Sequence, residues 1–215
     1  MAISIGSNIT SLQAQRRLDV TSGKLSQAFN KLSSGYRINR GADDAAGLAI
    51  ADSLKAQSRI AGQALRNTND GISTIAIADG ALGEVANILS RLAELASQAA
   101  NGTLSTTQRS VVSNEFVALS SEIERIAAVT EFNGIKLLSG TNAVTIQVGT
   151  GSTTSSQIGY TNQLATLQGI GLGNASGALV YSINGTSDAA AATAARLALD
   201  AVYAAIYSVG ASRGI

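Results

Sequence analysis

The sequence predicts a mainly α-helical fold, an elongated rod of long antiparallel helices packed like a coiled coil, with a small β-hairpin region at one end. Three observations support this prediction. Apolar residues recur every seven positions over more than forty residues, two further segments place apolar residues in alternating steps of four and three, and only one short stretch alternates like a strand. A helix over residues 43–100 would be about 87 Å long, which makes the chain a rod.

The N-terminal segment is typical of an amphipathic helix of moderate strength. Its apolar stripe repeats every seven residues at Leu18, Leu25 and Leu32. Residues 33–44 follow with two glycines and mixed charge, so we place a boundary there. The two acids that end this stretch, Asp43 and Asp44, suit a helix N-terminus, and we interpret them as capping charges rather than as a metal or acid/base pair.

The longest predicted helix follows, and two apolar stripes run along it. The first stripe holds Leu54, Ala61, Thr68, Ile75, Leu82, Leu89 and Ala96. The second stripe, three or four residues from the first, holds Ile50, Leu65, Ile72, Val85, Leu92 and Ala99. Paired stripes at this spacing form the seam along which a long helix packs on partner helices.

A third helix is predicted to begin near Ser105, because Ser105 and Gln108 have the spacing of a capping box. Its apolar positions are Val112, Phe116, Leu119, Ile123 and Ile126. Asn133-Gly134 then predicts a turn, and Val144, Ile146 and Val148 alternate with polar residues as a half-buried strand does. Residues 149–162 are mostly Gly, Ser, Thr and Gln, which predicts a solvated loop or tip.

The last predicted helix spans 189–213 and is opened by Ser187 and Asp188. Its apolar positions are Ala195, Leu199, Val202, Ile206 and Val209. A helix of this length covers only about 38 Å of the long helix. Much of the seam therefore lacks a partner within the chain, so that either other subunits supply one or the chain is a fragment of something that continues.

The composition excludes several classes of function. With no Cys and no His, the chain has no thiolate nucleophile, imidazole base, zinc site or disulfide, and we find no polar constellation that an enzyme or a cofactor site would need. A net charge of +1 gives no electrostatic argument for nucleic acid. Apolar runs are only a few residues long, so neither membrane insertion nor a Sec-type signal is expected.

Four motifs resemble the N-terminal signatures of bacterial flagellin, in the same order and spacing. They are residues 32–39 (LSSGYRIN), 43–51 (DDAAGLAIA), 66–73 (RNTNDGIS) and 131–134 (EFNG), and residues 144–149 (VTIQVG) resemble the first strand of that family's β region. The resemblance implies a layout of four parts: an inner-tube helix and spoke at 1–42, long outer-tube helices at 43–130, a small β region with a minimal tip at 131–186, and the start of a returning helix at 187–215. Flagellins continue for several tens of residues after a segment like 208–215, so we expect a truncated form that does not build a normal filament alone.

The function that the resemblance implies is structural and not enzymatic, with no cofactor. Such subunits leave the cell unfolded through the flagellar type III apparatus, polymerise with other flagellin subunits beneath the cap and form the extracellular filament that drives motility. Absence of Cys, Pro and Trp suits passage through a narrow channel. The alternative is a hook–filament junction protein or another exported helical assembly protein.

The resemblance also implies two surfaces. Leu18, Leu25 and Leu32 would pack the core of the tube, although they could equally form an internal coiled-coil stripe. A second surface matches a segment used in protofilament contacts and recognised by the flagellin-sensing Toll-like receptor of animal hosts. Its residues are Leu89, Arg91, Glu94, Leu95, Gln98 and Glu115. Ser90 and Ala93 depart from the family pattern there, and the alternative is a solvated face beside a packed seam.

Overall fold

The computed structural model describes residues 8–140, 143–161 and 164–214. Four helices dominate it: α1 (Ile9–Ser34), α2 (Ala45–Ala100), α3 (Thr106–Val129) and α4 (Asp188–Arg213). The chain divides into two compact units, Met1–Gly62 and Gln63–Ile215, and α2 continues through the boundary between them. The prediction of a mainly α-helical chain with a small β region is confirmed.

In the first unit, α1 is closed at both ends by the caps that its sequence provides. The side chain of Asn8 accepts a hydrogen bond from the backbone N–H of Ser11 at 3.1 Å. At the other end Gly35 adopts a left-handed conformation (φ 71°), and its N–H donates to the carbonyl of Lys31. Glycine tolerates this conformation without a steric penalty, so the chain turns away from the helix axis here.

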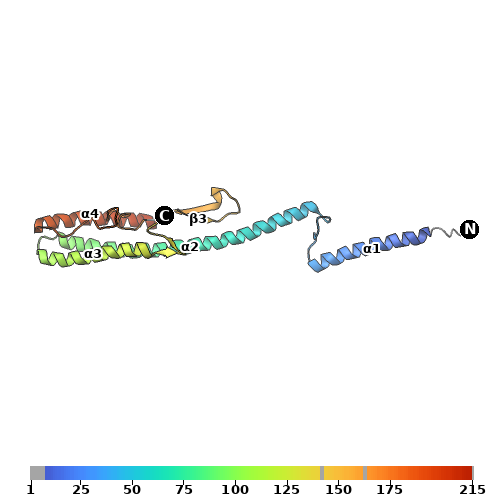
Figure 1. The fold of residues 1–215 in the computed structure, drawn as a ribbon, viewed down its shortest axis with the longest axis horizontal. Coiled ribbons are helices and arrows are strands. Elements are labelled where there is room, and N and C mark those ends of the chain that lie inside the picture. Colours follow the sequence, from blue (N-terminus) through green and yellow to red (C-terminus); the bar gives the residue numbers. More distant parts are fainter. Residues whose placement is uncertain (1–7, 141–142, 162–163, 215) are drawn as a thin grey trace, which may run out of the picture. The chain divides into compact units, whose positions relative to one another are not determined.

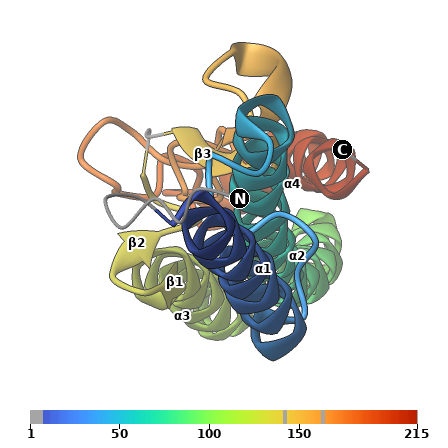
Figure 2. The same cartoon turned by 90° about the vertical axis from the view of Figure 1, so that its right-hand side faces the viewer.

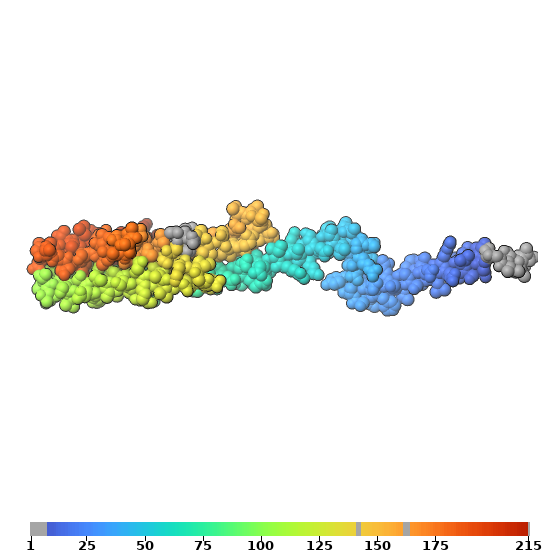
Figure 3. Space-filling model, viewed as in Figure 1, coloured from blue at the N-terminus to red at the C-terminus, as the bar shows by residue number. Residues whose placement is uncertain are grey.

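The second unit contains a bundle in which α3 and α4 both run antiparallel to α2 (Figures 1 and 2). The ion pairs agree with this direction: Arg91 of α2 bonds to Glu115 of α3, and Asp79 of α2 bonds to Arg213 at the end of α4. The starts of α3 and α4 meet where the Thr106 hydroxyl donates to Asp188. On the face seen in Figure 3 the green to yellow atoms of α3 lie beside orange to red atoms, which belong to the segment before α4 and to α4 itself.

The bundle core follows the predicted periodicity. Its buried side chains include Leu82, Val85, Leu89, Leu92 and Ala96 of α2, Phe116 and Ile123 of α3, and Ala195, Val202 and Val209 of α4. The predicted caps are also present. Ser105 and Gln108 form the reciprocal capping box of α3, and the side chain of Ser187 accepts from the N–H of Ala190 at the start of α4.

Two β-hairpins follow α3. The first pairs β1 (Glu131–Phe132) with β2 (Ile135–Lys136) across Asn133 and Gly134, both at positive φ, which confirms the predicted turn. The second pairs β3 (Ala143–Gln147) with β4 (Gln157–Thr161), joined through the short 3-10 helix η1 (Thr154–Ser156). The prediction of a loop throughout 149–162 is therefore wrong for 157–161. This segment contains Ile158, Tyr160 and Thr161, which favour strands, and it pairs with β3.

The segment 164–186 has little regular structure, yet it covers part of the bundle. It inserts Ala165, Leu167, Ile170, Leu172 and Ile183 into the core. The carboxylate of Glu124 on α3 accepts a hydrogen bond from the backbone N–H of Leu167 at 2.8 Å. This segment is therefore a packed cover over α3.

Two of the helices, α2 and α4, contain windows long and apolar enough to cross a membrane by length and composition alone. This differs from the expectation based on uninterrupted apolar runs, because alanine keeps the mean hydropathy of these windows high. One or two such helices are weak evidence for membrane spans, and both α2 and α4 supply core residues to the bundle.

Candidate functional site

The predicted α1 stripe, Leu18, Leu25 and Leu32, lies exposed on α1, and no residue of this helix is buried. Residues seven apart are almost two helical turns apart, so the three leucines lie on one side of the helix. We call these residues the terminal stripe. Its side chains are available to a partner helix.

The seam of α2 is divided into an exposed part and a buried part. The exposed positions are Ile50, Leu54, Leu65, Ile72 and Ile75, whereas from Leu82 onward the stripes are buried under α3 and α4. This confirms the expectation that much of the seam lacks a partner within the described chain.

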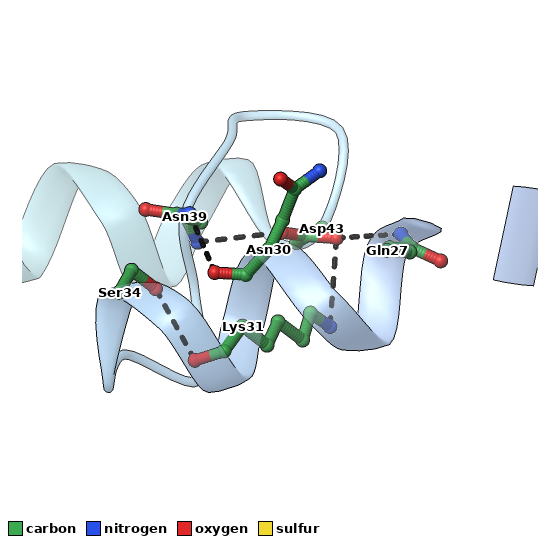
Figure 4. A network of polar contacts seen from close by, with 6 residues as sticks. All are labelled: Gln27, Asn30, Lys31, Ser34, Asn39 and Asp43. Atoms are coloured by element: carbon green, nitrogen blue, oxygen red, sulfur yellow. Dashed lines mark hydrogen bonds and ion pairs between the residues drawn. The ribbon is translucent and has the colours of Figure 1, made fainter. Parts of the chain in front are cut away.

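The joint between α1 and α2 is organised by Asp43 (Figure 4). Its carboxylate accepts hydrogen bonds from the backbone N–H of Asn39 at 3.3 Å and from Nε2 of Gln27 at 2.8 Å, and Nζ of Lys31 lies 3.5 Å away. The side chain is only 6% exposed. The Asn39 N–H, with Gln27 and Lys31, holds the pKa of the Asp43 carboxyl below its usual value.

The capping role predicted for the two acids holds for one of them. The carboxylate of Asp44 accepts from the N–H of Gly47 at 2.9 Å, at the first turn of α2. Asp43 instead fastens the loop to α1, which corrects its interpretation as a cap. Only an acid placed directly before the first helical residue can reach the free N–H groups of that turn.

The second predicted surface is partly assembled in the structure. Arg91 of α2 donates through Nε and Nη2 to Glu115 of α3, at 3.1 and 2.9 Å, and through Nη1 to Glu94, at 2.8 Å. All three side chains are exposed, and we call them the charged cluster. The carboxylates of Glu94 and Glu115 raise the pKa of Arg91, so the guanidinium stays charged.

Leu89 and Leu95 do not lie on this surface. They are 0% and 1% exposed and belong to the bundle core, while Gln98 is exposed. The spacing of Arg91, Leu95 and Gln98 predicted a shared face, but α2 packs on both α3 and α4. Its buried stripe is therefore wide enough to include Leu95.

Sequence reasoning missed Arg109, whose side chain is fully buried at the start of α3. Its Nη1 donates to the carbonyl of Asp188, and its Nη2 donates to the carbonyls of Asn101 and Leu104. One guanidinium thus joins the α2–α3 loop to the first residue of α4. The signal was present, because Arg109 stands three residues before Val112 and so extends the apolar stripe of α3 by one position.

Comparisons with known proteins agree on one family. The family described as the bacterial flagellin N-terminal helical region matches residues 5–143. Flagellin A of Vibrio cholerae is 44% identical over 163 residues, which cover 75% of this chain and 43% of that protein. Flagellin A of Vibrio anguillarum is 43% identical over the same shares of the two chains. The chain thus spans less than half the length of these relatives.

The same similarity extends to three dimensions. The crystal structure of Bacillus cereus flagellin superposes with a TM-score of 0.56 at 29% identity, over 69% of this chain and 79% of that one.

Proposed function

The chain belongs to the bacterial flagellin family, and from this premise we propose that it is a structural, non-enzymatic subunit of the flagellar filament. The curated relatives named above are flagellins, which favours a filament subunit over a hook–filament junction protein.

The observation that carries the proposal is the exposure of the terminal stripe and of the first part of the α2 seam. Fully burying one leucine contributes about 1.5–3 kcal/mol, so stripes of this length favour association once partner helices are present. The occupants that fit a heptad stripe are helices of neighbouring flagellin subunits. In this proposal residues 1–42 line the inner tube, residues 43–130 form the outer tube, 131–186 form the β region, and 187–215 belong to the returning helix.

The route of delivery is part of the same proposal. The subunit leaves the cell unfolded through the flagellar type III apparatus and folds beneath the cap into the extracellular filament. Two features support this route: the chain has no Cys, Pro or Trp, and α1 buries none of its residues before a partner is present.

A matched pair of variants tests the terminal stripe. Leu25 is 57% exposed and Val20 is 58% exposed, but Val20 lies away from the stripe on α1. We expect Leu25→Gln to reduce incorporation of the chain into seeded filaments, measured by sedimentation and electron microscopy, while Val20→Gln incorporates normally. Equal incorporation of the two variants, with equal helix content by circular dichroism, would remove the terminal stripe from the assembly surface.

The charged cluster supports a second proposal, recognition by the flagellin-sensing Toll-like receptor of animal hosts. A fixed guanidinium flanked by two carboxylates offers a partner oriented charges on an exposed face. We expect Arg91→Ala to lower receptor signalling by the chain. Arg125→Ala is the control, because Arg125 forms an exposed ion pair with Glu122 on α3 outside the cluster. Equal signalling by the two variants would mean that Arg91 does not take part in receptor recognition and is only a solvated residue beside the packed seam.

A further inference from the structure

Asparagine followed by glycine occurs three times in the chain: Asn101-Gly102, Asn133-Gly134 and Asn184-Gly185. In this dipeptide the backbone nitrogen of glycine can attack the side-chain amide carbon Cγ of asparagine. Glycine has no Cβ to hinder the approach. The reaction is governed by how closely the folded chain holds the two atoms together.

Asn184 is the one of these residues whose side chain accepts a hydrogen bond from the next backbone nitrogen. The N–H of Gly185 lies 3.0 Å from Oδ1 of Asn184, and Cγ is one bond from that oxygen. The hydroxyl of Ser182 holds the backbone of Asn184 on both sides, since it accepts from the Asn184 N–H and donates to the Asn184 carbonyl. Gly185 itself packs against the backbone of Ala191 in the first turn of α4.

The other two dipeptides are held differently. Oδ1 of Asn101 accepts from the N–H of Thr103, two residues on, and the Asn101 carbonyl is bound by Arg109. Asn133 has φ 49° in the turn between β1 and β2, where the pair Phe132 and Ile135 fixes both sides of the turn. Neither arrangement directs the glycine nitrogen to the asparagine side chain.

We propose that Asn184 is a site of spontaneous deamidation in the folded chain. The Gly185 nitrogen loses its proton and bonds to Cγ of Asn184, the bond from Cγ to the side-chain nitrogen breaks, and ammonia leaves with that proton. The resulting five-membered succinimide is opened by one water molecule, which gives either aspartate or isoaspartate at position 184. The only co-reactant is solvent water.

The two products act differently on the start of α4. Aspartate adds a negative charge three residues before the cap Ser187, close to the positive end of the helix, where an anion is tolerated. Isoaspartate inserts one methylene into the backbone between Ile183, which is fully buried, and Gly185, which contacts α4. It therefore displaces one of these two anchors and loosens the first turn of α4.

The test uses the three dipeptides as internal controls. The chain is incubated at neutral pH, folded or in guanidinium chloride, and then cleaved with chymotrypsin. Cleavage after Leu95, Phe132 and Tyr181 releases peptides that each hold one asparagine. Mass spectrometry then measures the deamidated fraction, and isoaspartyl methyltransferase reports isoaspartate. We expect Asn184 to convert at least about tenfold faster than Asn101 and Asn133 in the folded chain, and all three at similar rates when unfolded.

Two results would overturn the proposal. One is conversion of Asn184 in the folded chain no faster than that of the other two sites. The other is an equally large rate advantage of Asn184 over Asn101 and Asn133 in guanidinium chloride. The folded geometry would then not be the cause of its faster deamidation. Ser182→Ala gives an independent check. Ser182 is exposed, so the fold tolerates the change, and its loss is expected to slow conversion at Asn184 alone. An unchanged rate there would remove the positioning role of the hydroxyl.

Discussion

Arg109 connects the loop between α2 and α3 to the start of α4. Its buried guanidinium donates to carbonyls of Asn101, Leu104 and Asp188, which belong to two separate segments of the chain. A buried charge is costly in itself, but removing it also removes three hydrogen bonds from a charged group, and such bonds contribute about 1.5–3 kcal/mol each. The residue therefore fixes where α4 begins relative to α3 and acts as a local clamp on the bundle.

We predict that Arg109→Met lowers the free energy of unfolding of the bundle by about 3 kcal/mol or more, measured by denaturant titration. Arg125→Met is the matched control, because Arg125 is exposed and its ion pair with Glu122 has little effect on stability. Similar losses for the two variants would mean that the three carbonyls find water once the guanidinium is gone.

Asp43 gives a prediction about pH. The pKa of its carboxyl is lowered in the folded chain, chiefly by the Asn39 N–H, so the loop contacts are favoured when the group is charged. Their contribution is fully present above the usual aspartate value and is lost as the pH falls through the lowered pKa, below about pH 4. We expect the amide proton shift of Asn39 to titrate in that range by NMR. Asp43→Asn should abolish this titration and Asp19→Asn should leave it unchanged.

At the scale of elements, the second hairpin depends on a glycine of α2. Gly71 lies under Ile146 of β3, and Nδ2 of Asn67 donates to the carbonyl of Gln147 at 2.9 Å. Any side chain at position 71 meets the end of the Ile146 side chain. Glycine at position 71 lowers the helix propensity of α2, but its lack of a side chain allows β3 to pack closely on the helix.

A comparison of two glycines in the interior of α2 separates the effect of helix propensity from the effect of contact with Ile146. A Cβ added at Gly80 meets nothing within 4 Å, whereas one added at Gly71 meets Ile146. We expect Gly80→Ala to stabilise the chain by about 0.5–1 kcal/mol, and Gly71→Ala to gain less because Ile146 has to move. Thermal unfolding of both variants measures the difference. An equal gain would show that the hairpin accommodates the methyl group without loss.

Local sequence patterns are sufficient to predict some elements of the fold but not others. The cap residues Asn8, Ser105 and Ser187 satisfy free N–H groups within three residues, so the sequence predicts the starts of α3 and α4 well. β4 was missed because its pairing with β3 is a contact between separate segments. The cover formed by 164–186 was missed for the same reason, since its apolar residues follow no period.

At the scale of the whole molecule, stability is distributed unevenly. The part of α2 from Ala78 onward is buried under two helices, whereas α1 buries no residue. Most of the stability of a helix in a protein comes from packing of its amphipathic face, and α1 has no buried face of this kind. The chain therefore combines a stable bundle with a helix that gains most from association.

We predict that amide hydrogen exchange follows this division. The amides of α1 should exchange at least about 100-fold faster than those of α2 residues 82–99, because their opening needs no loss of packing. Mass spectrometry of peptides after timed deuteration measures the ratio. Incorporation into filaments should slow exchange in α1. Comparable protection of the two regions in the free chain would contradict the view that α1 is unsupported.

Local chemistry is enough to predict most of the helices, their caps, the turn at Asn133-Gly134 and the heptad seam, because each depends on contacts within a few residues. Tertiary packing decides the remainder. It determines that the α2 seam is buried from Leu82 and exposed before it, that Leu95 belongs to the core, and that Arg109 is buried. These outcomes depend on which helices lie against each face, and periodicity shows that a face is apolar without showing what covers it.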